Sequence, residues 1–433
     1  MTGWSGPLGE ALAALIDHRG KTPKKLGTDW VDDGVRVLSA LHVKGGRLQA
    51  EPQRFVPRDV YDRWMPEKLQ AGDVLLTSEA PLGEVAYLSE SVEACLGQRL
   101  FGLRPKPEVL DSRYLFYLLQ HSSLRSQLLQ RSSGTTVAGI RQAELVRVAL
   151  ELPPLDHQQR VADALGSFDD LLENNRRRIE ILEEMARLLY REWFVHFRFP
   201  GHEDVEVVDS ELGPIPEGWE MARVEEIQAD IRNATAAGPF GSKLGRKDYV
   251  DQGVPVIRGT NLAVGGGFLD SGFVYVSEQK AATLSSSMAR PGDILVTQRG
   301  TLGQCGLIPD TANHSEYVIS QSQMKLTCDA DKIHPVIVHM QLALPEGVQQ
   351  VLSMATGSGV PHINLGMFRE MKMLVPSRHV QDPFVEATEP MFRLERNLRA
   401  QNRVLSEVRD LLLPRLVSGD LDVSELDLDG VLA

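Results

Sequence analysis

The chain has 433 residues, more than one ordinary hydrophobic core accommodates, which predicts two or more domains. Hydrophobic residues make up 42% and charged residues 24% of the chain, which excludes a disordered protein, and no apolar run is long enough to span a bilayer. The net charge of −13 is concentrated, because residues 200–220 alone contribute −7, whereas residues 1–150 and 221–375 are close to neutral. Charge therefore neither supports nor excludes a nucleic-acid partner.

The start of the chain and its cysteines suggest a compartment. Residues 1–20 contain no basic run followed by an apolar core, which is the pattern of a secretory signal. The three cysteines, Cys95, Cys305 and Cys328, are scattered and odd in number, which disfavours a disulfide scaffold and a zinc site. We therefore expect a cytoplasmic protein with free thiols and no metal.

Short β-branched segments and two helix-like stretches alternate along the chain. The segments are bounded by Gly, Pro and Asp, as strands and turns should be. The predicted strands are Val35–Leu38, Val74–Thr77, Val254–Ile257 and Ile294–Thr297, and the predicted helices cover 112–130 and 335–354. Each half of the chain is thus a mixed α/β unit with a largely antiparallel sheet.

Two longer helices carry a heptad pattern of apolar residues. In 161–193 the apolar positions are alternately four and three residues apart, with only Asn175 polar, and in 391–412 only Gln401 is polar. Neither helix can bury such a stripe alone, so we expect each to pair with the other in antiparallel orientation. The alternative is that each helix packs on its own domain.

The chain contains one internal repeat with an offset of roughly 220 residues. The landmarks, in the same order in both copies, are Gly34-Val-Arg-Val-Leu38 and Gly253-Val-Pro-Val-Ile257, Ala71-Gly-Asp-Val-Leu-Leu-Thr77 and Pro291-Gly-Asp-Ile-Leu-Val-Thr297, Pro81-Leu-Gly83 and Thr301-Leu-Gly303, and Ser133-Gly-Thr-Thr-Val137 and Thr356-Gly-Ser-Gly-Val360. A period this long indicates two copies of one domain, not a solenoid.

The repeat and the helices together predict an α/β (α+β) fold class. Two tandem mixed α/β domains are separated by two long antiparallel coiled-coil helices, with pseudo-two-fold symmetry. One chain of this kind can imitate a DNA-binding dimer while its two domains read different half-sites. The predicted boundaries are 1–152 for the first domain, 153–199 for the first long helix, 200–220 for an acidic linker, 221–376 for the second domain, 377–420 for the second long helix and 421–433 for an acidic tail.

Several motifs resemble the specificity subunits of type I restriction-modification systems. Those that resemble the target-recognition domains are Gly238-Pro-Phe-Gly-Ser242, Val254-Pro-Val-Ile-Arg-Gly-Thr-Asn261 and Gly292-Asp-Ile-Leu-Val-Thr-Gln-Arg-Gly300. Those that resemble the spacer helices and their flanks are Leu152-Pro-Pro-Leu-Asp-His-Gln-Gln159, Leu182-Glu-Glu-Met-Ala-Arg-Leu-Leu-Tyr-Arg-Glu-Trp-Phe194, Leu212-Gly-Pro-Ile-Pro-Glu-Gly-Trp219 and Arg409-Asp-Leu-Leu-Leu-Pro-Arg-Leu-Val-Ser-Gly-Asp420. The resemblance covers nearly the whole chain, although the first domain lacks a clear Gly-Pro-Phe-Gly-Ser.

The resemblance implies a DNA-binding subunit that reads a bipartite double-stranded DNA target, one half per recognition domain. It further implies that the chain binds two modification subunits, which hold S-adenosylmethionine and methylate adenine, and that restriction subunits with motor activity join this core. This chain itself would then hold no cofactor and catalyse no reaction.

Two other functional classes remain open at this stage. A methyltransferase or nuclease with its own recognition domain would need a pocket for a flipped base or a cofactor loop, and neither the Asn/Asp-Pro-Pro-Tyr/Phe motif nor G-x-G-x-x-G occurs. A coiled-coil scaffold that binds only proteins would show no DNA binding.

Candidate DNA contacts are Lys or Arg beside Ser, Thr, Asn or Gln in predicted loops, because cations hold phosphates and both types can read base edges. In the first domain these are Lys21, Thr22, Lys24, Lys25, Lys44, Ser78, Arg99, Thr135, Thr136 and Arg141. In the second domain they are Ser242, Lys243, Arg246, Lys247, Arg258, Asn261, Gln298, Arg299, Thr301, Ser358, His362 and Asn364.

A partner surface is predicted where aromatic residues crowd the end of the first long helix. Such residues are enriched in protein interfaces, although core packing explains them equally well. The predicted partner contacts are Tyr190, Trp193, Phe194 and Phe197.

Overall fold

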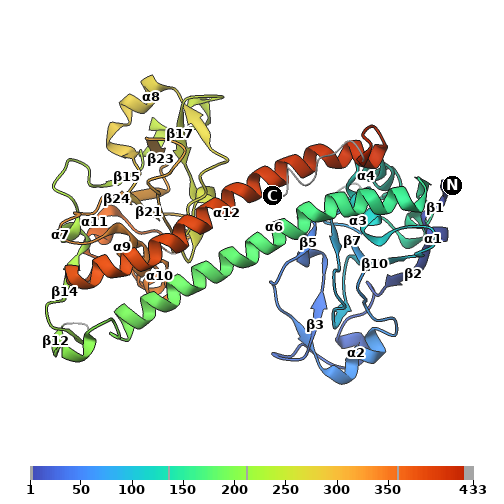
Figure 1. Ribbon diagram of the computed structural model, residues 1–433, viewed down its shortest axis with the longest axis horizontal. Helices are drawn as coiled ribbons and strands as arrows, with labels where there is room; N and C mark the ends of the chain where they lie inside the picture. Colours follow the sequence, from blue (N-terminus) through green and yellow to red (C-terminus); the bar gives the residue numbers. More distant parts are fainter. Residues whose placement is uncertain (1–2, 135–136, 211–212, 358–359, 424–433) are drawn as a thin grey trace. The chain divides into compact units, whose positions relative to one another are not determined.

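The computed structural model describes the chain except for residues 1–2, 135–136, 211–212, 358–359 and 424–433. The described chain divides into two compact units (Figure 1). Unit 1 combines residues 1–177 with the C-terminal residues from Leu398 onward, and unit 2 consists of Arg178–Asn397. Each unit therefore contains one part of each long helix.

Unit 1 is built on a four-stranded sheet with the order β2-β10-β7-β8 and a three-stranded sheet with the order β6-β3-β9, among the residues that the structure describes. Smaller pairs join β1 to β11 and β4 to β5. The strands are β1 (Trp4–Pro7), β2 (Leu12–Asp17), β3 (Val35–Leu38), β4 (Val43–Lys44), β5 (Arg47–Leu48), β6 (Phe55–Val56), β7 (Val74–Thr77), β8 (Val85–Tyr87), β9 (Ala94–Leu96), β10 (Leu100–Pro105) and β11 (Ala149–Leu152).

Unit 2 repeats this plan with two larger sheets, ordered β15-β24-β21-β22-β18 and β16-β19-β17-β23-β20. Pairs β14-β25 and β12-β13 complete its described strands. The strands are β12 (Val207–Ser210), β13 (Gly213–Pro216), β14 (Glu220–Arg223), β15 (Thr235–Ala237), β16 (Tyr249–Val250), β17 (Val254–Ile257), β18 (Ala263–Val264), β19 (Val274–Val276), β20 (Met288–Ala289), β21 (Ile294–Thr297), β22 (Gln304–Leu307), β23 (Tyr317–Ile319), β24 (Gln323–Leu326) and β25 (Lys372–Val375).

The strand pairings confirm the internal repeat. In each unit one pairing is parallel, β3 with β9 and β17 with β23, while the other described pairings between strands are antiparallel. The glycine before the repeated strand has the same role in both units. Gly34 and Gly253 have φ of +151° and +149°, and a Cβ there would lie 2.3 Å from the Val56 carbonyl oxygen or 2.2 Å from that of Val276. Only glycine fits this close approach of two strands.

The repeated Gly-Asp motif has a structural explanation. The Asp73 carboxylate is buried, accepts hydrogen bonds from the Gln70 amide and the Arg104 guanidinium, and raises the pKa of Arg104. The Asp293 carboxylate is buried in the same way and accepts from the Arg290 amide and from Lys325 Nζ at 2.9 Å. In each unit the turn before a central strand is thus fixed by an ion pair to a buried carboxylate.

The shorter helices pack on these sheets, and both predicted helices are divided in two. The stretch 112–130 forms α3 (Ser112–Gln120) and α4 (Ser122–Gln130), and the stretch 335–354 forms α9 (Pro335–Ala343) and α10 (Pro345–Ser353). Pro345 explains the second break, because proline favours the first turn of a helix over its interior. The others are α1 (Leu8–Ala11), α2 (Arg58–Trp64), α5 (Gln142–Leu145), α7 (Val224–Ile227), α8 (Glu278–Thr283) and α11 (Leu365–Glu370).

The two long helices are α6 (Leu155–Tyr190), which continues into a π-helical turn at Arg191–Val195, and α12 (Arg378–Ser418). The first turn of each contains a buried glutamine that the sequence analysis did not single out, Gln158 in α6 and Gln381 in α12. The Gln158 side chain accepts from the Asp111 amide and donates to the carbonyl oxygens of Val109 and Pro153. Gln381 makes the equivalent bonds with His334, Lys332 and Pro376. This network anchors each long helix to its own unit.

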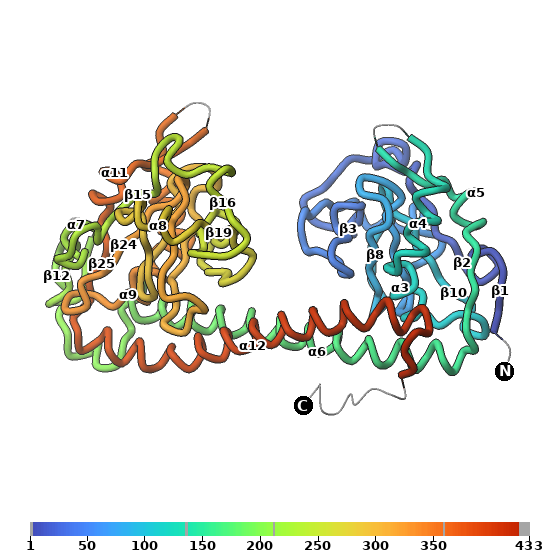
Figure 2. Tube along the Cα trace, turned by 90° about the horizontal axis from the view of Figure 1, so that it is seen from above, coloured from blue at the N-terminus to red at the C-terminus, as the bar shows by residue number. Residues whose placement is uncertain are grey.

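Within unit 1 the first part of α6 pairs with the last part of α12, as the colours of Figure 2 show. Phe168 and Leu172 form a buried apolar cluster with Leu405. Asn175 Nδ2 donates to Gln401 Oε1 at 2.9 Å and to Asn402 Oδ1 at 3.0 Å. The polar position of one predicted seam thus contacts that of the other, which confirms the pairing and its antiparallel direction.

Within unit 2 the last part of α6 meets the first part of α12 through aromatic rings. Phe384 lies with its ring centre 4.7 Å from that of Phe194, 5.7 Å from that of Trp193 and 5.9 Å from that of Tyr190. Both helix parts also contribute to the main core of unit 2. The helix α12 starts 13 residues before the predicted seam residue Met391, within the predicted bounds 377–420, and it includes Pro383 and Pro390.

The acidic segment 200–220 contains structure of its own. The strands β12 and β13 pair as an antiparallel ribbon with Val208 opposite Ile215, and Ile215 and Trp219 are buried. None of the helices described is long and apolar enough to cross a membrane.

We expect Phe384→Ala to lower the free energy of unfolding by about 3–5 kcal/mol, because it removes a fully buried ring that three aromatic side chains contact. Urea unfolding followed by tryptophan fluorescence measures the change. The matched control is Phe240→Ala, whose ring is 74% exposed and whose removal should change the free energy of unfolding by no more than about 0.5 kcal/mol. Equal losses for the two variants would contradict the role of Phe384.

Candidate nucleic-acid interface

Loops from separate parts of unit 2 meet at one end of its sheets, and we call this set of loops the loop edge of unit 2. It consists of 238–243, 258–261, 298–301, 320–322 and the described part of 356–362. Gln298 is its centre, because its amide donates to the Ser322 carbonyl at 2.8 Å and its own carbonyl accepts from the Ile363 amide at 3.0 Å. The Ser320 amide donates to the Ile257 carbonyl at 2.9 Å. The described part of 356–362 lies at the end of the unit away from the long helices (Figure 2).

Buried polar side chains hold these loops in place. Asn261 Oδ1 accepts from the Arg258 amide, and Asn261 Nδ2 donates to the carbonyl oxygens of Leu269 and Ser271. Gln298 Nε2 donates to the Gln321 carbonyl at 2.7 Å. Asn261 and Gln298 are 1% and 7% exposed, so the prediction that they contact DNA is wrong: their polar atoms are used inside the protein.

The loop edge of unit 1 has the same backbone hydrogen bonds. It consists of 39–42, 78–83, 97–99 and the described part of 133–139. The Ser78 amide donates to the Arg99 carbonyl at 2.8 Å, the Ile140 amide donates to the Ser78 carbonyl at 2.9 Å, and the Gly97 amide donates to the Leu38 carbonyl at 2.8 Å. Ser78 therefore takes the place of Gln298, and its 2% exposure makes its predicted DNA contact wrong as well.

The counterpart of Asn261 in unit 1 is His42, which the sequence analysis missed. His42 Nδ1 accepts from the Ser39 amide at 2.9 Å, as Asn261 Oδ1 accepts from the Arg258 amide, and His42 Nε2 lies 2.6 Å from the Pro52 carbonyl oxygen. Both residues are 1% exposed. The only sequence signal was their equal distance after the repeated strand, since histidine and asparagine share little except polar atoms.

Most predicted contacts of unit 2 do lie on exposed parts of its loops. Arg258 is half-buried and donates to the Gly272 carbonyl, His362 is half-buried, and the side chain of Asn364 caps α11 by accepting from the Met367 amide. Ser358 lies outside the described residues. The exposed predicted contacts are Ser242, Lys243, Arg246, Lys247, Arg299, Thr301 and Asn364.

The predicted contacts of unit 1 are less uniform. The prediction that Lys21 contacts DNA is wrong. Its Nζ donates to the carbonyl oxygens of Arg63 and Trp64, and burial lowers the pKa of its ammonium group, so this charge is used within the unit. Thr22 is half-buried, and Thr135 and Thr136 lie outside the described residues. The exposed predicted contacts are Lys24, Lys25, Lys44, Arg99 and Arg141.

Sequence reasoning by charge also missed exposed apolar side chains on both edges. Phe240 is 74% exposed and Leu41 is 68% exposed. Exposed apolar groups at a set of converging loops mark interaction sites, and in DNA the thymine methyl is an apolar feature of the major groove. The Gly-Pro-Phe-Gly motif was the available signal for Phe240, because glycines flank an aromatic residue there.

The predicted partner contacts Tyr190, Trp193 and Phe194 are buried in the core of unit 2, and Phe197 packs edge-on against Trp219 with ring centres 5.5 Å apart. Tyr190 is so enclosed that burial raises the pKa of its phenol. The prediction that these rings bind a partner is therefore wrong, and the alternative of core packing holds. The exposed apolar residues of α6 in this unit are instead Ile181, Met185 and Leu188.

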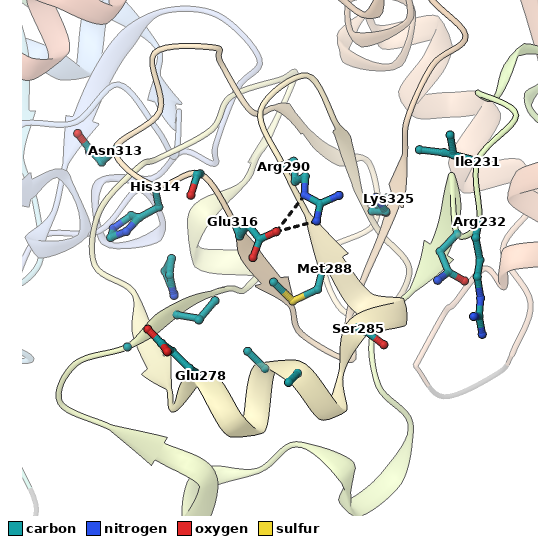
Figure 3. Close-up of a pocket in the computed structure, with 17 residues that line it drawn as sticks. Ile231, Arg232, Glu278, Ser285, Met288, Arg290, Asn313, His314, Glu316 and Lys325 are labelled. Carbon is teal, nitrogen blue, oxygen red and sulfur yellow. Dashed lines mark hydrogen bonds and ion pairs between the residues drawn. The ribbon is translucent and has the colours of Figure 1, made fainter.

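Unit 2 also has an open hollow of about 720 Å³, shown in Figure 3. It lies by the first residues of β17 and the turn before β21, whereas the loop edge follows the last residues of those strands. Of the cations that line it, Arg290 points at Glu316, with 2.7 Å between Nη2 and Oε1. The hollow is thus separate from the loop edge. No cluster of three or more His, Cys, Asp or Glu suited to a metal ion occurs in the described part of the chain.

Comparisons with known proteins agree with this architecture. Residues 14–184 match the type I restriction modification DNA specificity domain family. The MjaIX type I restriction enzyme specificity subunit of Methanocaldococcus jannaschii is 28% identical over 362 residues, which cover 82% of this chain and 79% of the relative. The EcoKI specificity subunit of Escherichia coli is 20% identical over 90% of this chain and 83% of its own length.

A solved structure shares the fold. The type I restriction-modification S subunit from M. genitalium superimposes with a TM-score of 0.57 over 95% of both chains, at 17% identity. The resemblance inferred from the sequence motifs is thereby confirmed. The chain is similar to the type I restriction enzyme specificity subunits, and residues 14–184 match the type I restriction modification DNA specificity domain.

Proposed function

We propose that this chain is the sequence-specific DNA-binding specificity subunit of a type I restriction-modification enzyme and that each unit reads one half of a bipartite target. The observation that carries the proposal is the repeated loop edge. Both units hold their loops by the same backbone hydrogen bonds, yet they present different exposed side chains. Such a scaffold supports two readers of unlike DNA sequences.

The proposal assigns the chemistry to partner subunits. Two modification subunits hold S-adenosylmethionine and methylate adenine, restriction subunits join them, and this chain supplies the choice of sequence. The names of the relatives as type I restriction enzyme specificity subunits support this division.

Removal of this chain from its host should abolish one split adenine-methylation motif, because no other subunit would direct the modification to it. Sequencing of native genomic DNA with detection of modified bases measures this. Return of the wild-type chain should restore the motif, and purified chain incubated alone with labelled S-adenosylmethionine and DNA should transfer no methyl group. A methylation pattern that stays the same after removal would refute the proposal.

We expect Lys243→Ala combined with Lys247→Ala to weaken binding to all DNA sequences alike, because both exposed ammonium groups lie on or beside the loop edge of unit 2. The slope of log K against log salt should fall by roughly 1 for each phosphate group that the variant no longer neutralises. Fluorescence anisotropy over a salt series gives the slope. The control is Lys332→Ala, whose Nζ donates to the Glu226 carbonyl away from the loop edge, and an unchanged slope in the double variant would remove both lysines from the interface.

The exposed stripe Ile181, Met185 and Leu188 is our candidate for contact with a modification subunit, because its spacing of four and three residues puts one apolar face of α6 in solvent. Changing all three to Gln should retain helix propensity and DNA binding by the chain but abolish methylation in the host. Genomic methylation and anisotropy give the two readings. Glu180→Gln, at an exposed position on the same helix, is the control, and normal methylation with the triple variant would exclude the stripe.

A further inference from the structure

The hydrogen bonds of the two loop edges align their residues one by one. Ser78 corresponds to Gln298 and Arg99 to Ser322, because the same amide-to-carbonyl bond joins each pair. The next residue along the chain therefore makes Glu79 the counterpart of Arg299. At these two equivalent positions unit 1 has Glu79 and Arg99, whereas unit 2 has Arg299 and Ser322. The two edges differ in charge where their backbones agree.

In unit 1 these two side chains form an exposed ion pair. Arg99 Nε lies 3.2 Å from Glu79 Oε1, and the side chains are 51% and 42% exposed. The residue opposite Glu79 is Gly139, which leaves room for the Glu79 side chain. A Cβ at position 139 would lie only 3.2 Å from the Glu79 Cβ. A β-bridge between backbones joins Glu79 to Gly139 in unit 1, and the corresponding β-bridge joins Arg299 to His362 in unit 2. Of these two positions, only the acidic residue of unit 1 therefore faces a glycine.

The backbone at this pair is unusual. Arg99 has φ of +64°, and Ala80, which follows Glu79, has φ of +52°. Residues with a side chain rarely adopt this left-handed conformation, and where they do, the surrounding structure must hold them there. Here the Arg99 carbonyl is held by the Ser78 amide. An ordinary surface ion pair stabilises a protein little and requires no such backbone.

A hollow of about 260 Å³ lies beside Arg99. Its walls include the exposed side chains of Trp30, Leu41 and Gln98, with Arg54 placed 5.5 Å over the Trp30 ring. The mixture of an aromatic ring, an aliphatic side chain and an amide is suited to base edges. The Glu79 carboxylate that pairs with Arg99 disfavours a phosphate group at Arg99, because the two anions repel each other.

We propose that Glu79 and Arg99 together read one G·C base pair in the half-site that unit 1 recognises, an inference that rests on the proposed function. In the major groove guanine offers two acceptors, N7 and O6, and cytosine offers the N4 donor. The Arg99 guanidinium supplies donors and the Glu79 carboxylate supplies an acceptor, so the pair matches both bases. Unit 2, with Arg and Ser at these positions, reads a different pattern.

Selection of randomised DNA duplexes by the full chain, followed by sequencing, tests the assignment. Glu79→Ala and Arg99→Ala should each reduce the preference for G·C by roughly ten- to a hundred-fold at the same single position. The other half-site should be unaffected, and the double variant should lose no more than the stronger single variant. Glu79→Ala should also raise the affinity for unrelated DNA, since it removes a negative charge from the surface.

The matched control is the exposed pair Arg58 and Glu93, with Arg58 Nη2 2.6 Å from Glu93 Oε1 at the opposite end of β9. Replacing both with Ala should leave every base preference unchanged, and thermal melting of all variants verifies that they are folded. Unchanged preference at every position in the Glu79 and Arg99 variants would overturn the inference. So would a uniform loss of affinity with a lower salt slope in Arg99→Ala, because that result identifies a phosphate contact. If the wild-type chain selects no split sequence at all, it is the proposed function that fails.

Discussion

The pairing of α6 with α12 is the constraint on which each unit depends. Each helix has an apolar seam that it cannot bury alone, and the partner segment comes from a distant part of the chain. Leu413 and Leu416 of α12 pack into the core of unit 1. They lie near the C-terminal end of the sequence, whereas the sheets of that unit come from its N-terminal part. Asn175 stabilises one register of this pairing, because a shift of the helices would leave its amide buried without Gln401 and Asn402.

In each loop edge, one set of residues holds the loops in place and a different set is exposed for binding. Buried polar side chains such as His42 and Asn261 hold the loops, and their hydrogen-bonding atoms face the protein. Exposed side chains between them are free to vary in charge and shape. A scaffold of this kind can change what it binds without changing how it folds, since surface substitutions have small effects on stability.

The sequence was sufficient for features that repeat or have a period. The heptad spacing located both long helices and the buried Asn175, and the repeat placed Gly34 and Gly253 at equivalent turns. The networks at Gln158 and Gln381 could not be derived, because they join a helix to backbone groups more than forty residues away in the chain. The aromatic residues near Tyr190 were ambiguous for a related reason: a crowded helix end looks alike whether a partner or the chain's own core covers it.

Residue type alone does not tell whether a side chain near a loop is exposed or is used inside the protein. Selection by residue type favoured lysines and amides near predicted loops, and it could not distinguish Lys21, whose ammonium is held by two carbonyl oxygens, from Lys243, which is exposed. It also passed over Glu79, because an acidic residue looks unsuited to a polyanion. A base pair, however, presents a donor as well as acceptors. A surface that reads sequence, and does not merely attract phosphates, can therefore use an acceptor among its cations, and only the folded loops reveal where such a pair forms.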